Sequence, residues 1–140
     1  MERLLHLDRT LDELDPPRWD APPADATRPV RKVHALRRVP LGELRPADLQ
    51  TLLAQRVGLP YVLPLTVRLL VAEPLLDAWF YEGDLLLTAV AVPDAAWDAL
   101  PGLAARLAAV VADLPEAAVA DLPRGAAREI VRFGSGSARR

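Results

Sequence analysis

Fourteen prolines among 140 residues constrain the fold of this chain more than any other feature of its sequence. A proline inside an α-helix removes a backbone hydrogen bond, and the residue before a proline is pushed out of the helical region. In the first turn of a helix proline is tolerated, because the backbone N–H there has no partner within the helix. Prolines also lie at the borders of the segments with helical patterning. The sequence therefore predicts several short helices in one compact domain.

Three segments, residues 27–38, 46–57 and 101–114, have the apolar spacing of amphipathic helices. Thr27 is a suitable N-cap for the first, and Gly58 suits a left-handed cap at the C-terminal end of the second. Thr10 and Glu13 form a capping box, which predicts a further short helix before Pro16. The residues expected to be buried on the three longer helices are Val30, Val33, Leu36, Leu49, Leu52, Leu53, Val57, Leu103, Leu107, Val110, Val111 and Leu114.

Two further apolar segments, residues 61–71 and 85–92, fit either a buried helix or a strand by composition. We favour a helix for the first, because Pro60 and Pro64 suit a helix start and would disrupt a central strand. For the second we favour a helix because Asp84 precedes it as a good N-cap. The expected fold is all-α, with one helical domain over residues 1–133 and a disordered Gly/Ser/Arg tail over residues 134–140.

The residues needed for catalysis or metal binding are scarce. The sequence has no cysteine, its histidines are His6 and His34, and its serines, Ser135 and Ser137, lie in the predicted tail. No glycine-rich phosphate loop is present, and the Glu82/Asp84 pair is interpreted as a turn residue followed by a helix cap. We therefore expect no enzymatic activity, no metal and no cofactor.

Charge and hydropathy give no signal for a membrane. The formal net charge is −2, and no apolar run reaches the ~20 residues that a bilayer-spanning helix needs. No signal peptide is recognisable either, so a cytoplasmic protein is expected. A nucleic-acid-binding helix is the weaker alternative, since no aromatic residues alternate with its basic ones. Those basic residues are Arg28, Arg31, Lys32, Arg37, Arg38 and Arg45.

The most distinctive surface feature is a run of three aromatic residues, positions 79–81, among acidic ones. Consecutive side chains cannot all face one core on a helix or a strand, so at least one should lie at the surface. Aromatic residues with an acidic rim are typical of a protein interface with a basic partner. The other interpretation places two of the rings in the core and leaves the acids merely solvated. The predicted contact residues are Glu73, Asp77, Trp79, Tyr81, Glu82 and Asp84.

Seven short motifs also occur in a fixed order along the chain. They are Asp25-Ala-Thr, His34-Ala-Leu-Arg-Arg, Pro40-Leu-Gly-Glu-Leu, Gly58-Leu-Pro-Tyr, Pro64-Leu, Pro74-Leu and Phe80-Tyr-Glu-Gly-Asp-Leu-Leu. This ordered set resembles the immunity proteins of bacterial contact-dependent growth inhibition (CDI) systems, over about residues 10–114. The resemblance implies a cytoplasmic antidote that binds the C-terminal toxin domain delivered by a neighbouring cell and blocks it without chemistry.

The resemblance supplies no catalytic motif, and its shared residues do not identify the toxin contacts. We therefore combine it with the acidic aromatic stretch and predict occlusion of a basic, nuclease-like active site. The expected partner is the cognate toxin domain, and the protein itself is expected to be a monomer or a weak dimer. The alternative is a small helical regulatory or scaffold protein that binds another protein.

Overall fold

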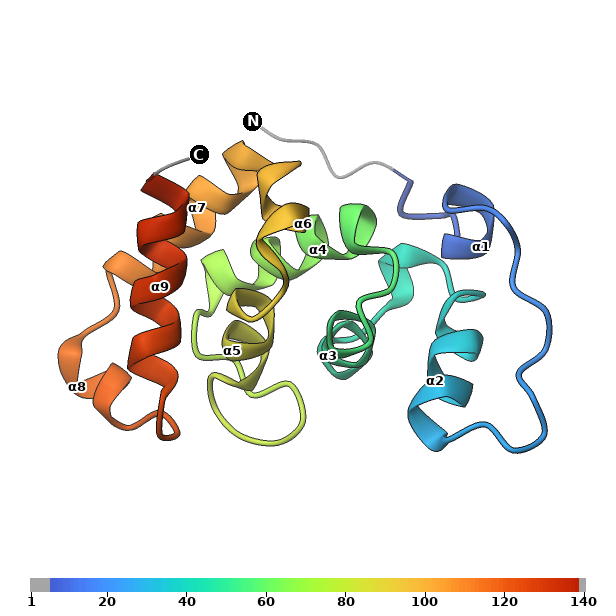
Figure 1. Ribbon diagram of the computed structural model, residues 1–140, viewed down its shortest axis with the longest axis horizontal. Coiled ribbons are helices and arrows are strands. Elements are labelled where there is room, and N and C mark those ends of the chain that lie inside the picture. The colour runs from blue at the N-terminus through green and yellow to red at the C-terminus, as the bar shows by residue number, and fades with distance from the viewer. Residues whose placement is uncertain (1–5, 139–140) are drawn as a thin grey trace.

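Prolines mark the beginnings of four of the five longest helices in the described part of the chain, as the sequence predicts. The computed structural model describes residues 6–138, and a proline occupies one of the first two positions of α2 (Arg28–Leu36), α3 (Pro46–Ala54), α4 (Leu59–Ala72) and α7 (Pro101–Ala112). The remaining helices are α1 (Leu11–Leu14), the 3-10 helix η1 (Leu41–Glu43), α5 (Asp84–Val90), α6 (Asp94–Asp98), α8 (Glu116–Ala120) and α9 (Ala126–Ala138). Over residues 6–138 no β-strand is formed, which confirms the all-α fold (Figure 1).

Side chains cap two helices where the sequence predicts it. The Thr10 hydroxyl accepts from the backbone N–H of Glu13 at 3.3 Å, and the Glu13 carboxylate accepts from the Thr10 N–H in return. The Thr27 hydroxyl accepts from the backbone N–H of Val30. Each cap satisfies N–H groups that have no partner within the helix. The predicted caps of α1 and α2 are confirmed.

The role predicted for Gly58 is wrong in detail. Gly58 is left-handed, with φ of 61°, but it precedes α4 as the N-cap, and the left-handed residue that follows α3 is Arg56. A Cβ on Gly58 would lie 2.7 Å from a methyl carbon of Leu11. Glycine is therefore required here both by the backbone conformation and by the close approach of α1.

Both apolar segments of ambiguous type are helical. Residues 61–71 lie within α4, with Pro64 in the interior of the helix and not at its start, and residues 85–90 lie within α5, which ends before Ala91 and Val92. Helix α4 packs against α3, α5 and α7, so that Val62, Leu63 and Val67 have no exposed surface. Thr66, the polar residue of its buried side, donates its hydroxyl to the carbonyl of Val62 at 2.9 Å. A buried central helix thus explains the near-continuous apolar pattern.

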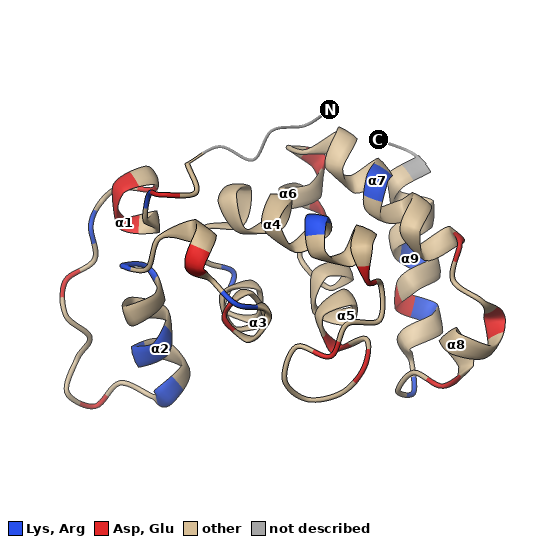
Figure 2. Cartoon of the chain, turned by 180° about the vertical axis from the view of Figure 1, so that it is seen from behind, with Lys and Arg blue, Asp and Glu red and all other residues tan. Residues whose placement is uncertain are grey.

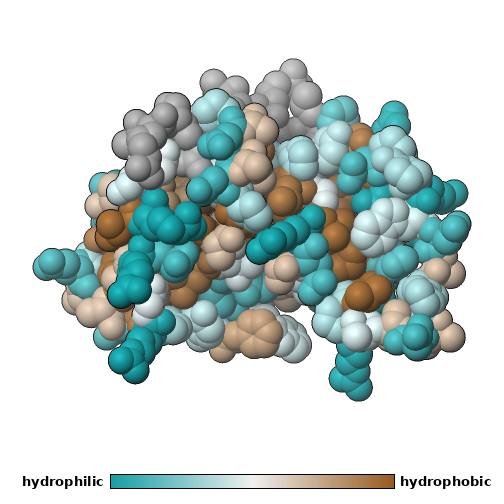
Figure 3. Space-filling view, viewed as in Figure 1, coloured by the Kyte–Doolittle hydropathy of each residue, from teal (hydrophilic) through white to brown (hydrophobic). Residues whose placement is uncertain are grey.

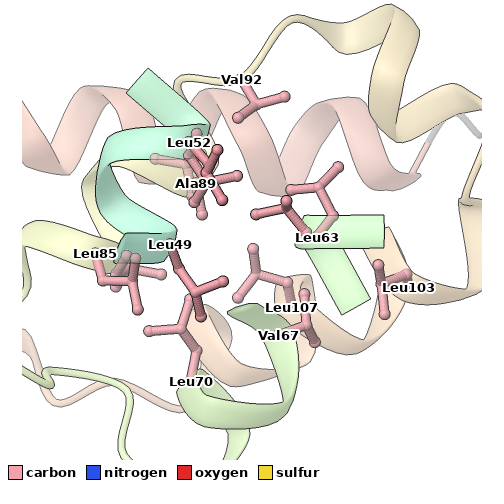
Figure 4. Packing of buried hydrophobic residues seen from close by; sticks show 14 of the residues in the cluster. Leu49, Leu52, Leu63, Val67, Leu70, Leu85, Ala89, Val92, Leu103 and Leu107 are labelled. Atoms are coloured by element: carbon pink, nitrogen blue, oxygen red, sulfur yellow. The ribbon is translucent and has the colours of Figure 1, made fainter. Parts of the chain in front are cut away.

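The core extends along the molecule from α2 at one end to α9 at the other (Figure 1). Figure 4 shows its centre, where side chains of α3, α4, α5 and α7 meet, among them Leu52, Leu63 and Leu107. At the far end, the rings of Trp97 and Phe133 meet edge to face with centroids 5.0 Å apart. Helix α9 also packs directly against α5 and α7, and these contacts join it to the core.

The structure differs from the predicted boundary at Phe133. Helix α9 continues through Gly134 and Gly136 to Ala138, where a disordered tail was expected, and residues 139–140 lie outside the described part of the chain. Glycine costs a helix about 1 kcal/mol relative to alanine and does not forbid it. The preceding turns of α9 are packed against the core, so the helix extends from an established start.

Arg37, one of the basic residues of the alternative nucleic-acid-binding helix, follows α2 as its C-cap and is buried, with only 1% of its surface exposed. Its Nε lies 2.9 Å from a carboxylate oxygen of Asp12, and a terminal nitrogen donates to the carbonyl of Asp15 at 2.8 Å. The guanidinium also lies 4.5 Å from the ring centre of Trp19. Arg37 therefore fixes the N-terminal segment against the end of α2, a structural role that removes it from any nucleic-acid-binding surface.

No helix among residues 6–138 combines the length and apolarity that crossing a bilayer requires.

Candidate functional site

An exposed loop of residues 73–83 connects α4 to α5, and we call it the aromatic loop (Figure 1). Its residues Trp79, Phe80 and Tyr81 are 72%, 68% and 40% exposed. The prediction that at least one of the three rings lies at the surface is confirmed, and the interpretation with two of them in the core is wrong. Three adjacent aromatic residues in solvent are unusual, because such side chains are ordinarily used to fill cores.

The Asp84 carboxylate holds the aromatic loop in place. One of its oxygens accepts from the backbone N–H groups of Ala78 at 2.9 Å and Leu85 at 2.7 Å. The other accepts from those of Trp79 at 3.0 Å and Phe80 at 2.8 Å. Four backbone donors thus converge on one carboxylate, which fixes the backbone that carries the first two rings. The exposed rings therefore project from an ordered turn.

The same contacts determine the charge state of Asp84. Burial by itself raises the pKa of this carboxyl, but the N–H groups of Phe80, Ala78, Trp79 and Leu85 lower it by more, so the pKa lies below its ordinary value of 3.8. Hydrogen bonds donated to a carboxylate favour its charged form. The group is therefore ionised at neutral pH, although its side chain is buried.

The aromatic loop closes on itself at its base. Asp77 and Glu82 form an isolated antiparallel bridge, and the N–H of Gly83 donates to the carbonyls of Leu75 and Leu76 at 3.1 and 3.3 Å. Gly83 has φ of 91°, and a Cβ at this position would lie 2.6 Å from a methyl carbon of Leu122. Any other residue would be strained here and would disturb the contact with the segment that follows α8.

The structure separates the predicted contact residues into two groups. Glu73, Asp77 and Glu82 are exposed on the aromatic loop together with Trp79 and Tyr81. Asp84 is only 1% exposed, so its prediction as a contact residue is wrong, and so is its prediction as the N-cap of α5, a position that Gly83 holds. The carboxylate is turned back toward the aromatic loop, where it accepts hydrogen bonds from the backbone N–H groups of residues 78–80.

A groove lies between the aromatic loop and the helix pair α2–α3. Its volume is about 190 Å³, and it is lined by Lys32, Ala47, Gln50, Thr51, Trp79 and Phe80. Figure 3 shows apolar side chains reaching the surface among hydrophilic ones on one face of the molecule. The predicted contact residues omitted Phe80 and the groove residues of α2 and α3, and Lys32 was named only among the basic residues of the alternative nucleic-acid-binding helix. Phe80 had a detectable signal in the aromatic run and Lys32 in its charge, whereas Ala47, Gln50 and Thr51 had none.

Charge is divided across this region. Figure 2 shows the basic residues of α2 apart from the acidic residues of the aromatic loop. Lys32, whose side chain is 51% exposed, lies 3.6 Å from the nearly buried carboxylate of Asp48. Lys32 therefore places one cationic group on the α2 side of the groove, while the aromatic loop on the other side carries exposed carboxylates.

The histidines show no metal-binding arrangement. The His34 ring nitrogen Nδ1 lies 2.9 Å from the carbonyl oxygen of Asp20, and its ring meets Trp19 edge to face at 4.8 Å. Over residues 6–138, no group of three or more His, Cys, Asp or Glu residues is placed to hold a metal ion. His34 thus packs the N-terminal segment against α2.

Comparison with known proteins identifies the family. The family model of CDI immunity proteins matches residues 13–107, which contain α2 to α6, the aromatic loop and the groove. No curated protein and no solved structure matched the chain. The matched residues make up well over half of the sequence, and they include every motif on which the resemblance rested. This chain therefore belongs to the family of CDI immunity proteins.

Proposed function

We propose that this protein binds the C-terminal toxin domain of its own CDI system in the cytoplasm and neutralises it by covering the toxin's active site with the aromatic loop. Membership of the immunity family supports a toxin-neutralising role. The observation that carries the assignment to this loop is the exposure of Trp79, Phe80 and Tyr81 on a turn held by Asp84.

The aromatic rings supply binding energy. Tyr and Trp are enriched among the interface residues whose truncation costs 2 kcal/mol or more, and they cluster near the centre of an interface. The hydrogen bonds to Asp84 hold the loop before the partner arrives. A preorganised loop loses less conformational entropy on binding, so more of the contact energy appears as affinity.

The exposed carboxylates of the aromatic loop attract a basic partner and orient it. A toxin that acts on nucleic acid needs a basic cleft to attract its substrate, and Glu73, Asp77 and Glu82 would attract the same cleft. Complementary charge mainly raises the association rate, and a carboxylate that becomes buried against a cation adds to affinity. An acidic loop with an aromatic tip therefore suits a basic active site.

Neutralisation by occlusion needs no reaction by the immunity protein. The carboxylates of the aromatic loop act through their charge, and its rings act through contact area. We propose accordingly that this protein functions without catalysis, cofactor or metal.

Reversing two loop charges tests the proposal. We expect Asp77→Lys combined with Glu82→Lys to weaken binding of the toxin domain encoded beside this gene by at least about tenfold at low salt, because both side chains are exposed and face a basic partner. High salt should shrink the difference, since exposed charges are screened beyond about 10 Å at 0.1 M. Titration calorimetry at two salt concentrations measures both effects.

The matched control is Asp113→Lys combined with Glu116→Lys, two exposed acids near α8 and outside the family match. This variant has the same net charge as the loop variant and should bind as the parent does. If the loop variant melts like the parent and also binds like it, the aromatic loop is not the interface.

A further inference from the structure

We infer that the groove beside the aromatic loop is a second part of the toxin-binding surface, which receives one apolar side chain of the toxin next to a toxin carboxylate that pairs with Lys32. This inference rests on the proposed function, because the occupant is a segment of the same toxin domain. It adds α2 and α3 to an interface so far assigned to the aromatic loop alone.

The size of the groove favours a protein side chain over a small molecule. Its volume of about 190 Å³ lies below the roughly 300–1,000 Å³ of sites that hold small ligands. Trp79 and Phe80 form one wall, and Ala47 and Thr51 of α3 belong to the lining as well. Aromatic rings beside a small residue make a recess for a single apolar group. Such recesses commonly receive the anchoring residue of a partner.

Gln50 provides an independent sign that a partner binds here. Its side chain lines the groove and is about nine-tenths buried, and its Oε1 accepts no hydrogen bond from residues 6–138. A buried carbonyl oxygen without a donor is unfavourable by an amount comparable to a lost hydrogen bond. If the Gln50 side chain turned this oxygen into the groove, an N–H donor on the inserted toxin segment would satisfy it. Thr51, the other polar neighbour on α3, already donates its hydroxyl to the carbonyl of Ala47 at 3.1 Å.

The charge of Lys32 indicates which group of the toxin lies next to the inserted apolar side chain. Lys32 has three N–H donors, and its ammonium group lies at 3.6 Å from Asp48 while half of its side chain remains exposed. A toxin carboxylate beside the apolar residue would pair with it. Asp77 and Glu82 are exposed on the neighbouring loop and disfavour a polyanion, so a protein segment fits better than a nucleic acid that stacks its bases on the rings.

Filling the groove tests the inference directly. We expect Ala47→Trp to weaken binding of the adjacent-gene toxin domain by more than about 30-fold in titration calorimetry, which is the scale of losing a central anchoring contact. The control is Ala105→Trp, which adds the same side chain at an exposed position of α7. It should bind as the parent does.

Substitutions at two polar residues of the groove test the same site without filling it. Lys32→Glu should weaken toxin binding by about tenfold or more, whereas Lys32→Arg should retain most of it. Gln50→Leu should weaken binding by about two- to tenfold, the range of one neutral hydrogen bond. If Ala47→Trp fails to fold, Lys32→Glu decides, and a parent-like affinity of this variant overturns the inference.

The outcomes separate this inference from the proposed function. If the parent does not bind the toxin domain, both fail. If the parent binds and the loop charge variant is weakened, but Ala47→Trp and Lys32→Glu bind like the parent, only the groove is excluded. Binding of a labelled ten-residue oligothymidine that Ala47→Trp abolishes would overturn it in favour of a nucleic-acid site. A concentration-dependent dimer that Ala47→Trp dissolves in sedimentation would overturn it in favour of a second copy of this chain.

Discussion

Asp84 is the residue whose chemistry determines the shape of the aromatic loop. Its buried carboxylate accepts four backbone N–H groups, three of them from consecutive residues of the loop tip. The carboxylate replaces water as the acceptor for donors that no secondary structure pairs. Asp84, which we predicted to contact the partner, is thus buried below the proposed interface and holds the loop in shape.

Replacing Asp84 by Asn should destabilise the protein by about 2–4 kcal/mol, because the amide removes the charge and places an NH₂ group against backbone donors. Urea unfolding measures the change, and Asp113→Asn, at an exposed position, is the control with an expected change within ~0.5 kcal/mol. Equal stabilities of the Asp84→Asn variant and the parent would mean that the four hydrogen bonds contribute nothing net.

The stability that Asp84 provides should depend on pH in a fixed direction. Its folded-state pKa is lowered, so the contribution is fully present above the unfolded-state value of about 3.9 and is lost as the pH falls through the folded-state pKa. The difference in unfolding free energy between the parent and Asp84→Asn should therefore stay constant from about pH 7 to pH 5 and shrink below about pH 4. A difference that grows in acid would contradict this assignment.

At the scale of elements, the packing of α7 on α4 is the contact that sequence periodicity anticipates best. Leu107 lies in the middle of the apolar stripe of α7, has no exposed surface, and belongs to the same buried cluster as Leu63 of α4 (Figure 4). Helical spacing fixes which side chains share a face, and a long amphipathic segment has one face to bury. The predicted stripe also extends past the helix end, since Leu114 follows the C-cap of α7.

Leu107→Ala should lower the free energy of unfolding by about 2–4 kcal/mol, because it leaves a cavity in a packed core. Val71→Ala is the control, since that side chain lies on α4 but is 45% exposed. Urea unfolding of both variants should give a change within about 0.5 kcal/mol for the control. A comparably small change for Leu107→Ala would place the stripe in solvent.

At the scale of the whole molecule, the last helix completes the core, although it lies beyond the residues that match the family. The matched residues stop at Leu107, yet α9 packs against α5 and α7 and buries Ile130 and Phe133. The ring of Phe133 meets Trp97 of α6, which donates its indole N–H to the carbonyl of Ala89 in α5. Helix α9 thus supports the same α5 whose N-terminus carries Asp84.

Phe133→Ala should therefore destabilise the whole domain by about 3–5 kcal/mol and not merely loosen α9. Val131→Ala, two residues earlier on the same helix and 66% exposed, is the control. Thermal unfolding followed by circular dichroism should show one transition at a lower temperature for Phe133→Ala. If a separate early transition precedes unfolding at the parent's temperature, α9 is an independent appendage.

The sequence by itself determined the features that depend on neighbours along the chain. Proline positions marked helix starts, and Thr10 and Thr27 were recognisable as the N-caps of α1 and α2. Apolar spacing separated buried from exposed helix faces. Three consecutive aromatic residues implied a surface ring without any knowledge of the fold. These inferences succeed because hydrogen-bond capping, proline geometry and helical period act within one or two turns.

Only the tertiary structure decided the features that depend on residues distant in the sequence. Arg37 is buried because Asp12 and Trp19 approach it from 25 and 18 positions earlier, and Asp84 is buried because its loop folds back over it. The groove brings Lys32 of α2 together with Trp79 of the aromatic loop. No local pattern encodes such an encounter, because it results from how α2, α3 and α5 pack, and packing is decided by the shape of the whole core.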